Sequence, residues 1–407
     1  YAYARFNPIY EDHYAMRGSP DDHPEDAPTV FATHSTHKLL AALSQASYIH
    51  VRDGRDAIPH DRFNQSYMMH ATTSPLYAII ASNDIASAMM DGAGGTMLTA
   101  DVIREAVDFR QAVARMYKRH QASGDWFFKP WNAEVVKDPQ TGKQHDFAEA
   151  PADLLVSEQD CWRLHPDDSW HGFTDLKDNW CMLDPIKVSL LTPGMGDDGK
   201  LLDTGVPAEL FTAYVSRFGI VPTRTTDFQV MFLFSVGITK GKWATLINTL
   251  LSFKRFYDRN APLTEVLPEL VQDHPNRYGS MGLKQLGDEM FDFLRQYDPG
   301  SVLNAAYSTI PEPAMSPRQA FQYMVSGDVE LVPAEKLAGR IAANAVMPYP
   351  PGIPMVMSGE NLGDTDSPQI NYLKALGQWD AAFPGFEHEV EGAEVVDGVY
   401  NVLCIKA

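Results

Sequence analysis

The stretch FATHSTHKLLAALSQASYIHV (31–51) places a single lysine, Lys38, between a cluster of polar side chains and an apolar run. Hydroxyl and imidazole groups occupy positions 33–37, and LLAAL follows at 39–43. The composition of residues 29–35 and 47–54 predicts a short strand on each side, with a helical turn after the lysine. The sequence therefore presents one amine where a strand passes into a turn of helix.

A free lysine amine is protonated at neutral pH, because its ordinary pKa is ~10.4. It becomes a nucleophile when apolar surroundings favour the neutral form, and the LLAAL run can supply such surroundings. The hydroxyls of Ser35 and Thr36, the imidazole of His37 and nearby backbone N–H groups can hold a phosphate. A lysine that needs both a desolvated amine and a phosphate anchor suggests pyridoxal phosphate, bound as a Schiff base.

The same residues allow two other interpretations, and the pattern alone leaves both open. A lysine after polar residues at a helix start is usually just solvated. His34 and His37 are spaced i, i+3 and could bind zinc, which needs a third and usually a fourth ligand. The acidic stretch DDHPED (21–26) offers such ligands, although a proline-interrupted acidic run is more often a solvated loop.

Composition and charge limit the class of protein. The 407 residues include 33 Lys and Arg against 53 Asp and Glu, a formal charge of −20 that argues against nucleic acid as the main partner. The three cysteines are too few and too scattered for a disulfide framework or a CxxC metal site, which suits a reducing cytoplasm. No window approaches 18 consecutive apolar residues, so no membrane span is expected.

Strands that alternate with helices predict an α/β fold. We expect a strand at 63–69, a helix after TTSP (72–75), a helix over 98–122, a buried strand at 230–234, helices over 239–260 and 283–297, and a hairpin over 389–405. The sequence DG at 397–398 supplies the turn of that hairpin. A domain boundary is expected near residue 261, after the long amphipathic helix.

Several long stretches carry a family resemblance: ATHSTHKLLAALSQASYIHV (32–51), FNQSYMMHATTSPLY (63–77), SWHGF (169–173), LDPIKVSLLTPGM (183–195), RIAANAVMPYPPGIPM (340–355) and FPGFE (383–387). Together they resemble the bacterial inducible ornithine/lysine/arginine decarboxylases. The resemblance implies an aspartate-aminotransferase-like fold of type I for pyridoxal phosphate enzymes. It also implies three domains: the C-terminal part of a large cofactor domain (1–90), a small α/β domain (91–261) and an α+β C-terminal decarboxylase domain (262–407).

The resemblance also implies roles for individual residues. Lys38 matches the Schiff-base lysine, while Ser35 and His37 match residues that contact the cofactor phosphate or lie beside the reacting amine. Thr72 matches a residue that reaches the cofactor phosphate of the neighbouring subunit, so the active site is expected at a homodimer interface. By itself TTSP offers hydroxyls and a helix N-terminus for an anion, or an ordinary N-cap pair.

The implied reaction is decarboxylation, in which the substrate amine displaces Lys38, CO2 leaves and Lys38 or His37 protonates Cα. The family's Asp-x-Ala-Trp segment and its ring-stacking histidine do not occur in this sequence. The chain opens YAYARFNPIYEDHYAM, without an initiator methionine or a signal peptide. We therefore expect it to be a portion of a longer enzyme.

The substrate is inferred from GIVPTRTTDF (219–228). Ornithine- and lysine-selective relatives carry a glutamate where Thr223 stands, and the neutral residue here resembles the arginine-specific members. Asp227 is a candidate acceptor for a planar guanidinium, and the alternative is a turn residue beside a strand. Arginine would give agmatine and CO2 and consume a proton, which implies acid resistance and a link to polyamines.

The negative charge also bears on assembly. Carboxylates that protonate as the pH falls towards ~5 reduce the repulsion between copies. The resemblance then implies a pentamer of dimers at acid pH, in the cytoplasm.

Four alternatives remain. These are lysine or ornithine decarboxylation, transamination on the same fold, a non-catalytic fragment that acts as an assembly subunit, and more distantly a zinc hydrolase.

Overall fold

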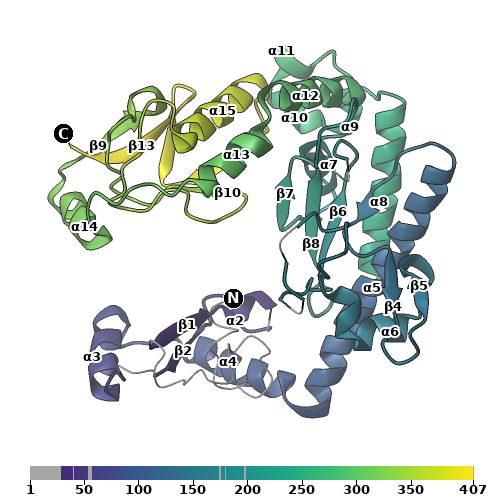
Figure 1. The fold of residues 1–407 in the computed structure, drawn as a ribbon, viewed down its shortest axis with the longest axis horizontal. Coiled ribbons are helices and arrows are strands. Elements are labelled where there is room, and N and C mark those ends of the chain that lie inside the picture. The colour runs from purple at the N-terminus through teal and green to yellow at the C-terminus, as the bar shows by residue number, and fades with distance from the viewer. Residues whose placement is uncertain are drawn as a thin grey trace. The chain divides into compact units, whose positions relative to one another are not determined.

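The computed structural model describes residues 29–39, 41–53, 57–173, 176–178, 180–196 and 199–406 (Figure 1). These residues form two compact units. Within the described ranges, unit 1 comprises 29–115, 131–188 and 233–243, and unit 2 comprises 116–130, 189–232 and 244–406. The domains expected at 1–90, 91–261 and 262–407 stay a prediction. The acidic stretch 21–26 lies outside the described residues.

Unit 1 begins with an antiparallel hairpin that carries Lys38. Strand β1 (Val30–His34) pairs with β2 (Tyr48–Arg52) so that His34 lies opposite Tyr48. A single helical turn, α2 (Thr36–Leu39), follows β1 directly. The two strands and the turn predicted from the sequence are confirmed.

The strand predicted at residues 63–69 is wrong, because this segment belongs to helix α3 (His60–His70). Asp61 in the first turn suits the helix dipole, and Gln65, Met68 and Met69 favour a helix. No described residue of α3 is buried, so the segment lacks the 3.6-residue apolar period that would have identified it.

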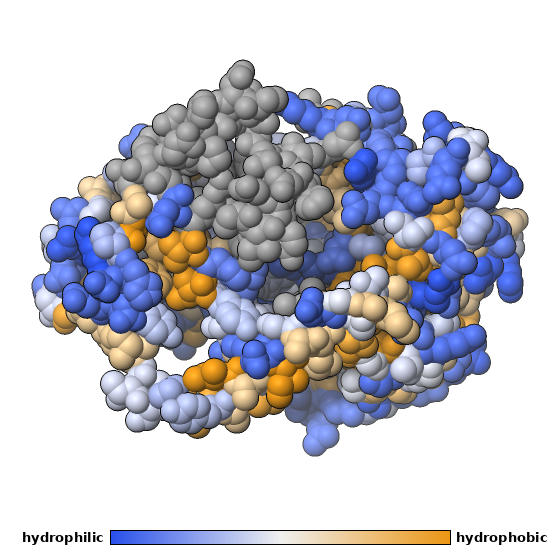
Figure 2. Space-filling view, turned by 90° about the horizontal axis from the view of Figure 1, so that it is seen from below, coloured by the Kyte–Doolittle hydropathy of each residue, from blue (hydrophilic) through white to orange (hydrophobic). Residues whose placement is uncertain are grey.

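Two further helices follow almost continuously, the second of which extends past the end of this part of unit 1 at residue 115. They are α4 (Tyr77–Met90) and α5 (Gly92–Ala122). Gly92, with φ +61°, allows the chain to change direction between them. Large apolar side chains on α3 and before and within α4 reach the solvent, among them Met69 at 82% and Tyr77 at 80% exposure. Hydrophobic residues are correspondingly visible at the surface in Figure 2.

The core of unit 1 forms against the buried face of α5. Val102, Ala106, Phe109 and Val113 are buried at helical spacing, which confirms the predicted amphipathic helix. Around it lie β4 (Val135–Lys137), β5 (Gln144–Asp146), η3 (Phe147–Glu149), α6 (Ala152–Ser157) and η4 (Gln159–Trp162). Together with α5 and the connecting segments, these elements form a cluster of buried side chains: Val107, Ala133, Val136, Phe147, Ala150, Leu155, Cys161 and Trp162.

Arg110 of α5 is fully buried in unit 1. Its guanidinium donates to the backbone oxygens of Trp131 (3.2 Å), Pro185 (3.2 Å) and Lys187 (2.8 Å), and to Oδ1 of Asn132 (3.3 Å). Burial lowers the pKa of Arg110 to about 9, and the neighbouring Asp184 opposes that shift. Four oxygen acceptors therefore satisfy a cation that has left the solvent.

A four-stranded sheet has the order β3-β6-β8-β7. Its strands are β3 (Lys129–Pro130), β6 (Lys187–Leu191), β8 (Gln229–Leu233) and β7 (Arg224–Thr226). Val230 and Phe232 of β8 are buried, as predicted for this apolar run. Helices α7 (Ala208–Ser216) and α8 (Lys240–Asp258) supply aromatic rings to unit 2, where Phe211 lies 4.7 Å from Phe128 and 5.3 Å from Phe253 between centroids.

Short helices connect α8 to the rest of unit 2. They are α9 (Leu263–Val266), α10 (Pro268–Asp273), α11 (Pro275–Tyr278) and α12 (Leu283–Tyr297). Helix α12 has the bounds predicted from the sequence.

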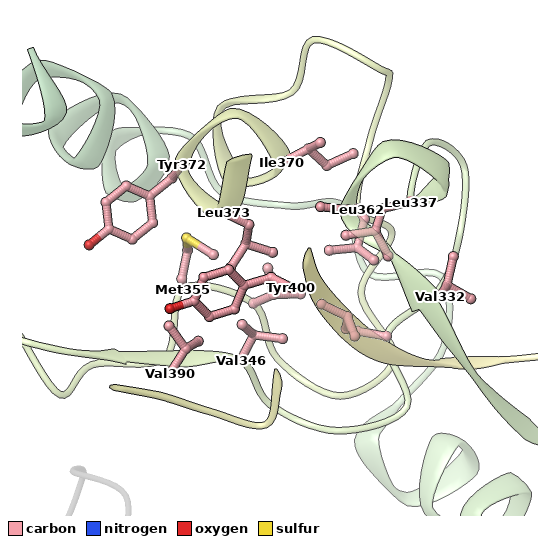
Figure 3. Packing of buried hydrophobic residues seen from close by; sticks show 14 of the residues in the cluster. Val332, Leu337, Val346, Met355, Leu362, Ile370, Tyr372, Leu373, Val390 and Tyr400 are labelled. Carbon is pink, nitrogen blue, oxygen red and sulfur yellow. The ribbon is translucent and has the colours of Figure 1, made fainter. Parts of the chain in front are cut away.

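The C-terminal segment 300–406 has its own core (Figure 3). Its elements are α13 (Pro299–Ser308), α14 (Pro317–Ser326), β9 (Val329–Pro333), η5 (Ala334–Lys336), β10 (Met347–Tyr349), α15 (Pro368–Ala382), β11 (Glu389–Glu391), β12 (Ala393–Val396) and β13 (Val399–Ile405). Strand β13 pairs with β12 and with β9, while β10 pairs with β11. The predicted hairpin is confirmed for β12 and β13, which Asp397 (φ +51°) and Gly398 (φ +77°) join.

Within the described ranges, no helix combines the length and the apolar character needed to cross a membrane.

Candidate active site around Lys38

Lys38 lies on a short loop between β1 and β2. The backbone N–H of Lys38 donates to the Ser35 oxygen at 3.2 Å, which closes the single turn of α2. Both Ser35 and Lys38 are exposed, and among the described residues neither side chain has a hydrogen-bond partner. Leu43 is 53% exposed, so the described part of the LLAAL run does not form the apolar wall that the sequence suggested. The loop leaves one amine and one hydroxyl accessible.

Helix α4 holds this loop through polar side chains. The Thr36 hydroxyl is buried and donates to Oδ1 of Asn83. The amide of Asn83 in turn donates to the Ser47 oxygen at 3.3 Å. The adjacent Ser82 also contributes, since its Oγ accepts from the Leu43 N–H at 3.1 Å. The loop is therefore fixed on one side by hydrogen bonds from α4.

His37 is half-buried, and its orientation is fixed within the loop. Its Nδ1 lies 2.9 Å from the Ala46 oxygen. Because a carbonyl oxygen only accepts, Nδ1 carries the hydrogen in this bond. Nε2 is then the atom of the neutral ring that can accept a proton.

The two strands of the hairpin place His34 beside His50, with ring centroids 4.6 Å apart. Burial, and then the neighbouring His50, lower the pKa of His34. In the described part of the chain, no three His, Cys, Asp or Glu side chains lie close enough to hold a metal ion. The zinc interpretation of His34 and His37 thus finds no third ligand there.

Thr72 lies in the turn between α3 and α4 and is exposed. Its Oγ1 accepts from the Ser74 N–H at 3.0 Å, the hydrogen bond of a Ser/Thr turn. This bond uses the hydroxyl oxygen as an acceptor and leaves its hydrogen free to donate.

Thr223 and Asp227, the candidate substrate residues, belong to unit 2. Thr223 is exposed, and its hydroxyl donates to the Met231 oxygen at 3.0 Å. Asp227 is half-buried in the turn between β7 and β8, where its backbone oxygen accepts from the Ala208 N–H at 2.8 Å. Burial raises the pKa of Asp227; His388 opposes this shift and Asp298 adds to it.

Next to Asp227 stands Glu209, in the first turn of α7. Its Oε2 is shut off from solvent and has no hydrogen-bond partner among the described residues. Burial, and then the charge of Asp227, raise the pKa of Glu209 well above its ordinary value. Burial and the nearby charge of Asp227 therefore both favour the protonated form of Glu209.

Sequence reasoning missed Asn83, Glu209 and Arg110. The spacing of Ser82, Asn83 and Ser87 on an otherwise apolar helix was a signal that one face of α4 meets polar groups. Nothing local in the sequence indicated which groups those were.

Comparisons with known proteins identify the family of the chain. The sequence model of the Orn/Lys/Arg decarboxylase major domain matches residues 1–242, and that of the Orn/Lys/Arg decarboxylase C-terminal domain matches residues 300–406. The biodegradative arginine decarboxylase of Escherichia coli (strain K12) is 66% identical over 407 residues, which are all of this chain and 54% of that protein. Lysine decarboxylase LdcA of Pseudomonas aeruginosa is 43% identical, over 100% of this chain and 52% of its own length.

Solved structures give the same result. Lysine decarboxylase A from Pseudomonas aeruginosa superimposes with a TM-score of 0.84 at 42% identity, covering 100% of this chain and 52% of that one. The constitutive lysine decarboxylase of Escherichia coli gives 0.81 at 36% identity, covering 99% and 53%. The chain spans about half the length of these relatives. The predicted α/β aminotransferase-like fold class is confirmed, and the chain belongs to the Orn/Lys/Arg decarboxylase family.

Proposed function

We propose that this chain is part of a pyridoxal phosphate-dependent arginine decarboxylase, which converts L-arginine and a proton into agmatine and CO2. The observation that carries the proposal is the 66% identity to a protein named biodegradative arginine decarboxylase, against 43% to the lysine decarboxylase LdcA. Because the match covers the whole chain, it includes both segments that hold the candidate site residues.

The residues of the Lys38 loop suit pyridoxal phosphate. Lys38 offers an accessible amine, Ser35 an accessible hydroxyl, and backbone N–H groups of the α2 turn lie beside them. Thr36 and His37 are engaged elsewhere, with Asn83 and Ala46. Lys38 would therefore hold the cofactor covalently and Ser35 its phosphate, with His37 beside them. Bound pyridoxal phosphate would supply a ring that accepts the electron pair released as CO2 leaves.

The proton that replaces CO2 at Cα needs a donor. Lys38 Nζ is one candidate, because it would be a free amine whenever it is not joined to the cofactor. His37 Nε2 is the other, and it would donate only after taking up a proton itself, since Nδ1 already donates to the Ala46 oxygen. Thr72, with a hydroxyl hydrogen free to donate, would serve the phosphate of a second subunit in a homodimer.

Substrate selection falls to unit 2 in this proposal. Thr223 is neutral and exposed. An uncharged residue at this position would not bind the compact ammonium group of lysine or ornithine as a carboxylate would. Asp227 would accept a guanidinium in its ionised form, and its burial, which raises its pKa, opposes that charge.

Assembly and location complete the proposal. The exposed apolar side chains of α3 and α4 suit a covered face in a dimer, and the charge of −20 suits association of dimers into a decamer as pH falls. The enzyme would work in the cytoplasm, in acid resistance. Sedimentation at pH 7 and at about pH 5 should then give a larger species at the lower pH; the same species at both would contradict it.

Product analysis tests the proposed reaction. The purified full-length protein is supplied with pyridoxal phosphate and equal amounts of arginine, lysine and ornithine at mildly acid pH. Agmatine as the sole amine is the expected result. Cadaverine or putrescine would move the assignment to lysine or ornithine, a keto acid would indicate transamination, and no product at all would favour a non-catalytic subunit.

A further inference from the structure

The loop that carries Lys38 has little internal support. Helix α2 is a single turn of four residues, and isolated helical turns of this length are unstable in water. The described loop also contains two non-glycine residues with positive φ, Ala41 (+57°) and Gln45 (+76°), which are unfavourable conformations. Its own hydrogen bonds, such as Ala46 N–H to the Leu43 oxygen at 3.1 Å, do not attach it to another element. Something outside the loop must therefore set its position.

Asn83 is in contact with both ends of the loop at once. Its Oδ1 accepts from the Thr36 hydroxyl at the start of α2, and its Nδ2 donates to the Ser47 oxygen just before β2. An amide side chain can do this because it combines an acceptor and a donor in one plane. By comparison, Ser82 is hydrogen-bonded to the loop only at Leu43, and Ser87 is hydrogen-bonded to the hairpin only at Tyr48.

The contact with Thr36 also bears on the direction of Lys38. Successive residues of a helix are about 100° apart, so residues two positions apart face nearly opposite sides. Thr36, 3% exposed, points towards α4, and Lys38 is correspondingly exposed on the other side. Fixing the Thr36 hydroxyl thus orients the amine without touching it.

We propose that Asn83 is a positioning residue for Lys38, acting through Thr36 and Ser47. This inference rests on the proposed function, in which Lys38 binds pyridoxal phosphate covalently. The inference assigns a role to a residue on another helix, 47 positions from Thr36. The side-chain amide of Asn83 would set the orientation of the Lys38 amine towards the cofactor.

The test compares Asn83→Ala with the matched control Ser87→Ala, both in the full-length protein. Ser87 lies one turn along the same helix and contacts the Tyr48 hydroxyl at 3.2 Å, but not α2. The readout is the rate at which borohydride reduction traps pyridoxal phosphate on the Lys38 peptide, measured by mass spectrometry. Since a hydrogen bond is worth a factor of roughly 2 to 12, loss of both should slow trapping about tenfold in Asn83→Ala and little in Ser87→Ala.

Amide hydrogen exchange supplies a readout without cofactor. Asn83→Ala should speed exchange across residues 36–47 and leave residues 77–90 unchanged, which a general loss of stability would not do. Thr36→Ser keeps the hydroxyl and should behave as the parent, whereas Thr36→Val should reproduce part of the Asn83→Ala effect. Combining Thr36→Val with Asn83→Ala should add little, because both remove the same bond.

The outcomes separate the two proposals. If the parent protein traps cofactor on Lys38 but Asn83→Ala reacts as fast as Ser87→Ala, the inference about Asn83 is overturned and the role of Lys38 stands. If the parent traps no cofactor on Lys38, the proposed function fails and this inference fails with it.

Discussion

The segment that carries Lys38 (29–90) and the C-terminal segment (300–406) are held together in different ways. Among the described side chains of the first, only Thr36, Ala46 and Ala86 are buried. The second has a continuous apolar core, in which α15 packs over the strands (Figure 3). The reactive loop is therefore positioned by hydrogen bonds from α4, while the C-terminal segment is stabilised by burial of apolar surface. We therefore expect substitutions in the Lys38 segment to change mainly activity, and substitutions in the C-terminal core to change mainly stability.

The largest expected effect is the loss of activity in Lys38→Ala. Without the amine the proposed cofactor attachment and one candidate proton donor are both removed, so decarboxylation should fall by at least 10²- to 10⁴-fold. The free energy of unfolding should change by less than about 0.5 kcal/mol, because Lys38 is exposed. Agmatine production and urea unfolding, measured on the same preparation, check both parts. Retention of a tenth of the parent activity would contradict the assignment.

The opposite behaviour is expected for Leu373→Ala in the C-terminal core. Leu373 is fully buried, so the substitution should lower the free energy of unfolding by about 3–5 kcal/mol. Met69→Ala is the matched change in the Lys38 segment, where Met69 is 82% exposed, and should cost less than about 0.5 kcal/mol. Thermal unfolding of the two variants measures the contrast. Equal losses would mean that Met69 is buried in the assembled protein.

The smallest of the three effects concerns pH and Glu209. A carboxyl group whose pKa is raised in the folded state binds more protons there than in the unfolded state. Its stabilising contribution is complete below the ordinary pKa of a glutamate and is lost as pH rises through the raised value. The contribution of Glu209 to the free energy of unfolding should therefore decline as pH rises above about 4.5.

Glu209→Gln, which resembles the protonated form, should remove this contribution, so that its free energy of unfolding falls less, or rises more, with pH than that of the parent. The control is Glu394→Gln on β12, where the side chain is exposed. Urea unfolding at a series of pH values gives the slopes. If Glu209→Gln keeps the slope of the parent and of Glu394→Gln, Glu209 does not carry the extra proton.

Local patterns were enough to predict much of this structure. The period of α12, the DG turn between β12 and β13 and the apolar run of β8 each identify their element from neighbouring residues alone. The same holds for the candidate site, because Ser35, His37 and Lys38 lie within four positions. Helix α3 was mistaken for a strand because it has no buried described face to impose a helical period.

Other features depend on distant residues and could not be read from local sequence. The bond between Thr36 and Asn83 joins positions 47 apart. The carboxyl pair requires α7 to meet the turn between β7 and β8, and only the folded chain brings Glu209 beside Asp227.

The environment of Arg110 has a consequence for the order of folding. All four acceptors of its guanidinium come later in the chain, 21 to 77 positions after it. During synthesis α5 emerges first, and its cation must stay hydrated until residues 185–187 have left the ribosome. The core of unit 1 can therefore close only after β6 has begun to form, which makes this a late, long-range step in folding.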